Sequence, residues 1–147
     1  MSDLDAFARL VPLDHGLVVV STARADGTIQ SSVVNAGLVD HPVTQRPVVA
    51  FVSAGSAQRL RHLRARPRAT VVIRAGWQWV GIEGAVDLAG PDDRLDGVDP
   101  GDLSGLLREI FTAAGGTHDD WDEYDRVMAS ERRVAVLVAP ERVYGTS

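Results

Sequence analysis

The chain has 147 residues, 45% of them hydrophobic, with a formal net charge of -5 and no cysteine. That length and apolar content predict one domain, residues 1–147, with a core of its own. The lack of cysteine excludes disulfides, a thiol nucleophile and a thiolate metal site. The net charge argues against a nucleic-acid binder, and no apolar run reaches membrane-spanning length. Without a basic, apolar leader, a cytoplasmic protein with no membrane partner is expected.

Helical spacing and β-branched runs predict the elements in chain order. They are a helix over 3–12, strands 17–22 and 28–38 joined at Asp26-Gly27, a loop over 40–47, strand 48–53, a basic helix within 53–68, strands 69–74 and 77–88, an exposed connection over 89–102, helices 103–113 and 121–130, and closing strands 133–139 and 143–144. Strands outnumber helices and short loops join most neighbours. This pattern favours a mainly β protein, one antiparallel barrel with a few packed helices.

The segment from Ser53 to Arg68 carries five arginines between two apolar strands. Its small residues open a helix, and free amides at a helix start suit an anion. Arg59 lies in the first turn and adds a fork of charged donors, so the hypothesis is a phosphate cradle formed by Arg59 and the backbone from Ser53 to Gln58. The other arginines fit a solvated helix face equally well, with Leu60 and Leu63 turned inward.

Two other features suit a flat heteroaromatic ligand. Trp77 and Trp79 are two residues apart on an expected strand, where both would point to one face. They fit a wall beside a ring, or equally core packing or a subunit interface. Gln30, Ser32 and Asn35 make the second strand more polar than its partner, which indicates an exposed face or a ligand surface.

No self-sufficient catalytic group is visible in the sequence. The four histidines lack metal-ligand spacing, and no nucleophile elbow or dinucleotide-binding glycine motif is present. A pocket without its own acid, base or nucleophile is typical of a protein whose cofactor performs the chemistry. No metal site is expected.

Four stretches give the chain a family resemblance. They are Gly16-Leu-Val-Val-Val with Ala25-Asp-Gly-Thr-Ile-Gln-Ser-Ser, the run from Ser56 to Ala69, Gly76-Trp-Gln-Trp-Val-Gly-Ile-Glu-Gly, and His118-Asp-Asp-Trp-Asp-Glu-Tyr through Arg132-Arg-Val to Val143-Tyr-Gly. In this order the chain resembles the split-barrel oxidoreductases related to pyridoxamine 5′-phosphate oxidase. The last stretch is similar to their subgroup that binds the deazaflavin coenzyme F420.

The resemblance implies a split barrel that works as a homodimer, with two cofactor sites at the subunit interface. Arg59 falls where the family holds the cofactor phosphate or acidic tail, usually with Lys, and Ala57 falls where several relatives have a second basic residue. The resemblance further implies a cofactor site that includes Gln30, Ser32, Val34, Val52, Ser53, Ala57, Gln58, Arg59, Trp77 and Trp79. The two tryptophans would come from the partner subunit.

The expected function is therefore an F420-dependent oxidoreductase that transfers a hydride to or from a small conjugated substrate. FMN is the alternative cofactor, since it has the same tricyclic outline with a shorter tail. A non-catalytic protein that carries the cofactor is the alternative from another class. The catalytic residues and the substrate stay open at this point.

Overall fold

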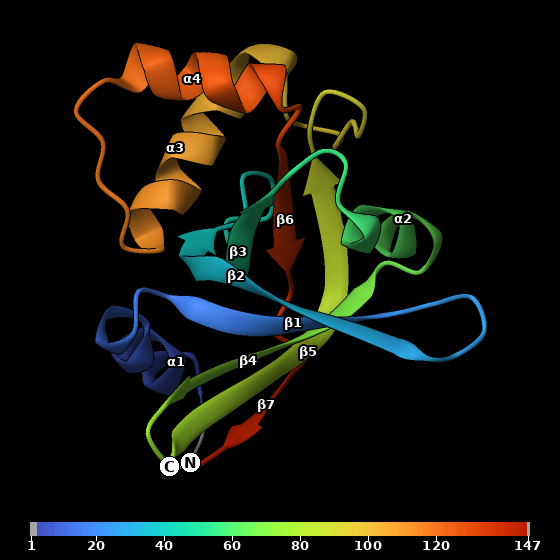
Figure 1. Cartoon of the computed structure of the whole chain (residues 1–147), viewed down its shortest axis with the longest axis vertical. Helices are drawn as coiled ribbons and strands as arrows, with labels where there is room; N and C mark the ends of the chain where they lie inside the picture. Colours follow the sequence, from blue (N-terminus) through green and yellow to red (C-terminus); the bar gives the residue numbers. More distant parts are fainter. Residues whose placement is uncertain (1–2, 147) are drawn as a thin grey trace.

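Six antiparallel strands close into a barrel in the computed structural model, which describes residues 3–146 (Figure 1). Their order around the barrel is β1–β2–β3–β6–β5–β4, and β4 pairs with β1 to complete the ring. The short strand β7 lies along β5 outside the ring. The bounds are β1 (Leu17–Ala23), β2 (Ile29–Asp40), β3 (Pro47–Ser53), β4 (Arg68–Ala75), β5 (Gln78–Ala89), β6 (Val134–Val138) and β7 (Arg142–Gly145).

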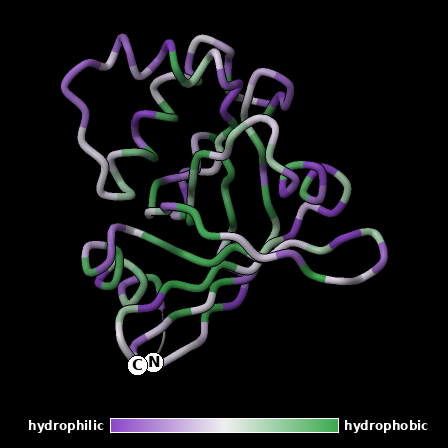
Figure 2. The backbone as a smooth tube through the Cα atoms, viewed as in Figure 1, coloured by the Kyte–Doolittle hydropathy of each residue, from purple (hydrophilic) through white to green (hydrophobic). Residues whose placement is uncertain are grey.

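Burial explains why some strands alternate and others read as continuous apolar runs. Along β2, residues 30, 32 and 34 are half-buried while 29, 31, 33 and 35 are exposed, as expected of a strand with one wet face. Strands β3 and β6 are buried on both faces because helices cover their outer side. Figure 2 shows the hydrophobic residues concentrated on the barrel strands, with hydrophilic ones along α2, α4 and the β1–β2 turn.

Four helices pack around the barrel: α1 (Leu4–Leu10), α2 (Gln58–Ala65), α3 (Leu103–Ala113) and α4 (Trp121–Ser130). The first two bury Phe7, Leu60 and Leu63 in the barrel core, which confirms the predicted inward face of the basic helix. Helices α3 and α4 form a second core on the outer side of β3 and β6. Leu106 and Ile110 of α3 lie in that second core, so the helix pair forms a wall above the barrel.

The predicted element order is confirmed, with shifts at several boundaries. The first helix ends at Leu10 and passes into a 3₁₀ turn over Val11–Leu13 rather than running to Pro12. The 89–102 connection holds a β-bridge between Gly90 and Asp93 and a 3₁₀ turn at Pro100–Asp102. None of the helices within 3–146 has the length and apolar character to cross a membrane.

Candidate functional site

A split in the barrel wall between β2 and β3 creates the candidate site. Residues 29–35 of β2 pair with β1, and residues 36–40 pair with β3 on the other edge. The β2–β3 ladder stops at the Ala36–Phe51 pair, although β3 continues to Ser53 beside β6. The two strands therefore separate between Ser32 and Ser53, next to the start of α2.

The Arg59 guanidinium spans this split. Its Nε and Nη2 donate to Ser32 Oγ on β2, each at 3.2 Å, and its Nη1 donates to Ser53 Oγ on β3 at 3.0 Å. Ser53 is 1% exposed, and its own hydroxyl donates to Ala54 O. Because Ser32 faces inward by strand alternation and Arg59 lies in the first turn of α2, the local structure of three elements fixes this arrangement.

Arg59 differs from the ion-paired arginines in the chemistry of its hydrogen-bond partners. Within residues 3–146, all its hydrogen-bond partners are hydroxyl groups, and no carboxylate forms an ion pair with it. Burial, and after it the positive charge of Arg133, lowers the pKa of the Arg59 guanidinium below its usual value. A half-buried cation with a like charge nearby is a site that an anion would stabilise.

Three of the four remaining arginines of the 53–68 segment contact other parts of the chain, whereas Arg61 is exposed. Arg64 forms a two-pronged ion pair with Asp93, and Arg68 pairs with Glu141. Arg66 donates from Nε to the carbonyl of Ala23. These contacts tie α2 and its C-terminal end to the barrel, so the anion hypothesis rests on Arg59 and not on the whole basic segment.

A cavity of about 460 Å³ opens from the split toward the helix pair, and we call it the main cavity. Its barrel side is formed by Val33, Val34, Asn35, Val52, Ala54 and Arg59. Its helix side is formed by Ile110, Phe111, Ala114, Tyr124, Met128 and, beyond α4, Arg133. Arg59 and Arg133 thus both line the cavity, while most of the other lining side chains are apolar or aromatic and Asn35 is polar. Such a space suits a flat apolar ring system attached to an anionic group.

An aromatic cluster holds the helix wall of the main cavity in place. Phe111 of α3 packs on Tyr124 of α4, with ring centroids 5.0 Å apart, and Trp121 lies edge-on to both rings. Tyr124 Oη donates to the carbonyl of Leu107 at 3.1 Å. Arg108 stacks over Trp121 with its guanidinium carbon 5.3 Å from the ring centroid and also pairs with Asp125. The wall is therefore braced by contacts between α3 and α4.

The structure brings some predicted site residues together and leaves others apart. Ser32, Ser53 and Arg59 are joined by hydrogen bonds, and Val34 and Val52 line the main cavity beside Arg59. Ala57 is the N-cap of α2, and Gln58 is its exposed first residue. Gln30 Oε1 is buried without a hydrogen-bond partner among the described residues, but Gln30 does not line the cavity.

The two tryptophans lie outside the main cavity of their own chain. Strand β5 begins at Gln78, so Trp77 belongs to the turn and the strand alternation expected for the pair does not extend to it. Trp77 is 95% exposed, and Trp79 is 37% exposed, with its ring edge-on to Tyr144. Neither residue packs in the core, so they are free for contacts outside the chain.

Sequence reasoning missed the second arginine and the helix wall. Arg133 lies just after α4 and reaches the cavity only because α4 packs over the barrel. A helix over 121–130 was expected, but the sequence did not show that Tyr124 and Met128 on it would face the cavity. The pattern of apolar positions in 103–130 was a signal for burial, whereas the partner of the buried face is a tertiary property.

No family model matches the chain, but solved structures do. A structure named F420 reductase is 16% identical, with a TM-score of 0.63, and covers 92% of this chain and 94% of its own. A pyridoxamine 5′-phosphate oxidase-related, FMN-binding protein from Nostoc punctiforme is 13% identical, with a TM-score of 0.65 and coverages of 95% and 79%. HutZ, a haem storage protein from Vibrio cholerae, is 11% identical, with a TM-score of 0.56 and coverages of 97% and 91%.

These likenesses show the fold. The chain is a split barrel of the kind found in pyridoxamine 5′-phosphate oxidase-like proteins, which confirms the expected fold class. Proteins of this fold include oxidoreductases as well as a haem storage protein, so the fold by itself does not decide between catalysis and cofactor storage.

Proposed function

We propose that the chain is an oxidoreductase that binds coenzyme F420 in the main cavity and transfers a hydride to or from a small conjugated substrate. The observation that carries the proposal is the pairing of an aromatic and apolar cavity with Arg59, a half-buried cation that has hydroxyl partners alone. A cofactor with a flat ring and a phosphate would match both parts. The solved F420 reductase of the same fold supports the choice of F420.

The residues present fit such a cofactor. Arg59 and Arg133 would hold its phosphate, and Val34 and Val52 would lie along its ring as an apolar wall. When bound, F420 supplies a hydride at its ring, whereas FMN can also supply single electrons. The chain would orient the ring and exclude water through the wall of α3 and α4. Because Tyr124 Oη already donates to Leu107 O, it is not placed to give a proton, which would come from solvent.

A second copy of the chain would complete the site. Val19, Val33 and Val72 lie at matching register positions on β1, β2 and β4, and Val19 and Val33 are 41% and 61% exposed. Val33 also lines the main cavity, so this apolar outer face runs into the site. A copy seated there would bury the face and would bring Trp77 and Trp79 of the partner subunit toward the ring.

FMN is the alternative cofactor, supported by the FMN-binding structure of the same fold. A non-catalytic cofactor carrier is the alternative from another class, supported by the haem storage protein of the same fold and by the lack of a committed acid or base among the described residues that line the main cavity.

Titration of the purified protein with F420 and with FMN tests the choice of cofactor. The expected result is tighter binding of F420, seen as a change in its fluorescence. Consumption of reduced F420 with enones or quinones then separates an enzyme from a carrier. Binding of neither cofactor would refute the proposed function.

A further inference from the structure

The turn that follows β5 presents two neighbouring carboxylates, Asp92 and Asp93. Strand β5 pairs with β6 as far as Ala89, which lies opposite Ala135, so the turn continues directly from a paired barrel strand. Gly90 N donates to Asp93 O at 2.9 Å and Asp93 N donates to Gly90 O at 3.2 Å, which closes the turn on itself. The backbone of the turn is therefore fixed relative to the barrel.

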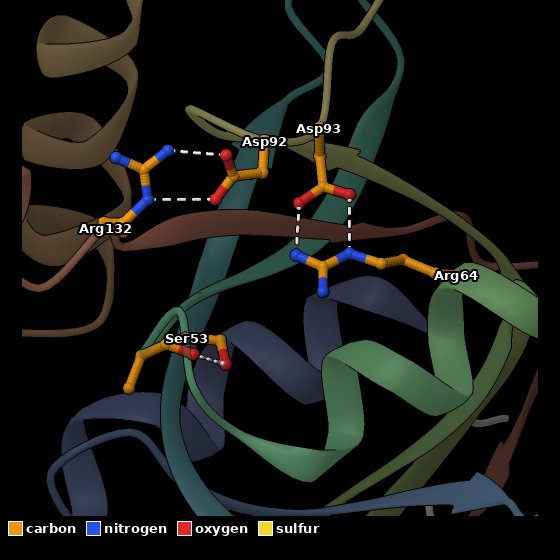
Figure 3. A network of polar contacts seen from close by, with 6 residues as sticks. Ser53, Arg64, Asp92, Asp93 and Arg132 are labelled. Carbon is orange, nitrogen blue, oxygen red and sulfur yellow. Dashed lines mark hydrogen bonds and ion pairs between the residues drawn. The ribbon is translucent and has the colours of Figure 1, made fainter.

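Each of these carboxylates holds one arginine by a two-pronged ion pair. Arg64 donates to Asp93 from Nε at 2.8 Å and from Nη2 at 2.7 Å. Arg132 donates to Asp92 from Nε at 3.0 Å and also from Nη2. Figure 3 shows the two pairs next to one another at the turn. Two parallel bonds fix the direction of a guanidinium as well as its distance, and the Asp93 side chain is only 11% exposed, so water competes weakly for its pair.

The two paired arginines belong to the two segments that carry the cations of the main cavity. Arg64 lies on α2, the helix that also carries Arg59. Arg132 directly precedes Arg133, and Arg133 N donates to Met128 O at 3.0 Å, a bond that closes the C-terminal end of α4. Holding Arg64 therefore restrains the helix that carries Arg59. Holding Arg132 restrains the backbone of Arg133.

The loop before α2 and the segment after α4 also touch each other directly. Gly55 N donates to Glu131 O at 3.2 Å, and a Cβ on Gly55 would lie 2.5 Å from Arg132 O, closer than a side chain can approach. The turn after β5, the α2 segment and the segment after α4 are thus each joined to the other two. These contacts together restrain the relative position of Arg59 and Arg133.

The two cations of the main cavity need such restraint because their charges repel. Burial, and after it the positive charge of Arg133, lowers the pKa of the Arg59 guanidinium. Arg59 donates only to the hydroxyls of Ser32 and Ser53, and in the described part of the chain no carboxylate pairs with it to offset the repulsion. A site whose cations are already held together when an anion arrives binds it more tightly, because little ordering remains.

We propose that Asp92 and Asp93 are positioning residues for the phosphate of the bound cofactor, and we call the two the aspartate clamp. Each acts through its arginine partner on one cation of the main cavity, Asp93 on Arg59 and Asp92 on Arg133. The inference rests on the proposed function, because that phosphate is the anion concerned. By charge alone, removal of a carboxylate near an anion site strengthens anion binding. Loss of the clamp is expected to weaken it.

The test uses two ligand pairs whose members share a ring and differ in the phosphate: FMN with riboflavin, and F420 with the same deazaflavin and ribityl chain without phosphate. Each ligand is titrated by fluorescence against wild type, Asp93→Asn and Arg64→Gln. These two variants break the same ion pair but change the net charge in opposite directions. Both should weaken the phosphate-bearing ligand about two- to fivefold, the range for a partly exposed charge pair, and leave its phosphate-free partner unchanged. Asp92→Asn should act in the same direction by a smaller factor, because the side chains of its pair are 55% and 58% exposed.

Asp125→Asn is the matched control. Asp125 also holds an arginine, Arg108, by a two-pronged pair, but this pair joins α4 to α3 and leaves α2 untouched. The ratio of its affinities for the phosphate-bearing and phosphate-free ligands should equal that of wild type. A urea melt of each variant checks that the protein is folded under the conditions of the titration.

Three results would overturn the clamp and leave the proposed function standing. If the phosphate-bearing ligand binds more tightly to Asp93→Asn and less tightly to Arg64→Gln, net charge alone explains the change. If both members of a ligand pair weaken equally, the ion pair has only a general structural role. If neither changes, the ion pair positions nothing that the ligand contacts. If folded wild type binds none of the four ligands, the proposed function is wrong and the clamp with it.

Discussion

Arg59→Ala is the most direct test of the anion site. The substitution removes a guanidinium that donates to Ser32 at 3.2 Å and to Ser53 at 3.0 Å across the barrel split. With cofactor bound, the same fork would face a phosphate. The free protein should lose little stability, because the substitution also removes a partly desolvated charge beside Arg133, and Ser53 Oγ keeps its own hydrogen bond to Ala54 O.

The magnitude follows from the chemistry of the lost contact. A hydrogen bond to a charged group contributes about 1.5–3 kcal/mol. Arg59 is half-buried, so its charge is only partly screened, and one such contact is a fair lower bound for the loss. Since about 1.4 kcal/mol is a tenfold change in affinity, Arg59→Ala should weaken F420 or FMN binding about 10- to 150-fold.

Isothermal titration calorimetry of each cofactor is the measurement, with a urea melt of each variant to check folding. Arg61→Ala is the matched control, since Arg61 lies on the same helix and is exposed outside the main cavity. Arg59→Lys should give an intermediate affinity, because an ammonium keeps the charge but cannot present a planar fork. Unchanged affinity in Arg59→Ala, or an equal loss in Arg61→Ala, would refute the reasoning.

Three further variants test the wall, the packing and the outer face. Tyr124→Phe should cost about 0.5–1.5 kcal/mol of stability at neutral pH, because Leu107 O loses its donor. Burial raises the pKa of Tyr124 above 10.0, so the stability that its neutral hydroxyl contributes is present below pH 10 and is lost as pH rises through the folded pKa. Urea melts should therefore show less alkaline destabilisation in Tyr124→Phe than in wild type. An equal fall in the free energy of unfolding with pH in both proteins would contradict this. Gly37→Ala should lower the free energy of unfolding by about 1–3 kcal/mol in the same melts and weaken cofactor binding, because the new Cβ would lie 2.4 Å from Ala113 O and displace α3. A change below about 0.5 kcal/mol, the range of a neutral surface substitution, would contradict the close packing. Val33→Asp should shift the protein toward a monomer in analytical ultracentrifugation, and an unchanged oligomeric state would place any interface elsewhere.

Local signals in the sequence predicted the elements well because each depends on neighbours in the chain. Asp26-Gly27 marked the β1–β2 hairpin, and Leu60 and Leu63 marked the buried face of α2. Apolar runs marked β3 and β6, the two strands covered on both faces. The family resemblance added the split-barrel topology, which no periodicity in one strand can supply.

Part of the site was predictable for the same reason. Arg59 follows a small-residue loop at a helix start, and that local pattern was enough to select it among the arginines. The sequence analysis named Ser32 and Ser53 as site residues but could not predict that Arg59 contacts both, because these contacts depend on where the β2–β3 ladder stops. Ladder register is set by pairing between strands distant in sequence.

The sequence by itself determined the order of strands and helices and the buried face of α2, and it selected Arg59 as the candidate for an anion site. Only the tertiary structure decided that α3 and α4 close the main cavity, that Arg133 joins Arg59 there, and that Trp77 stays outside it in its own chain. The physical reason is the separation along the chain over which each kind of signal acts. Periodicity and capping act within a few residues, whereas a cavity forms where several distant segments pack, and the burial of their apolar faces drives that packing.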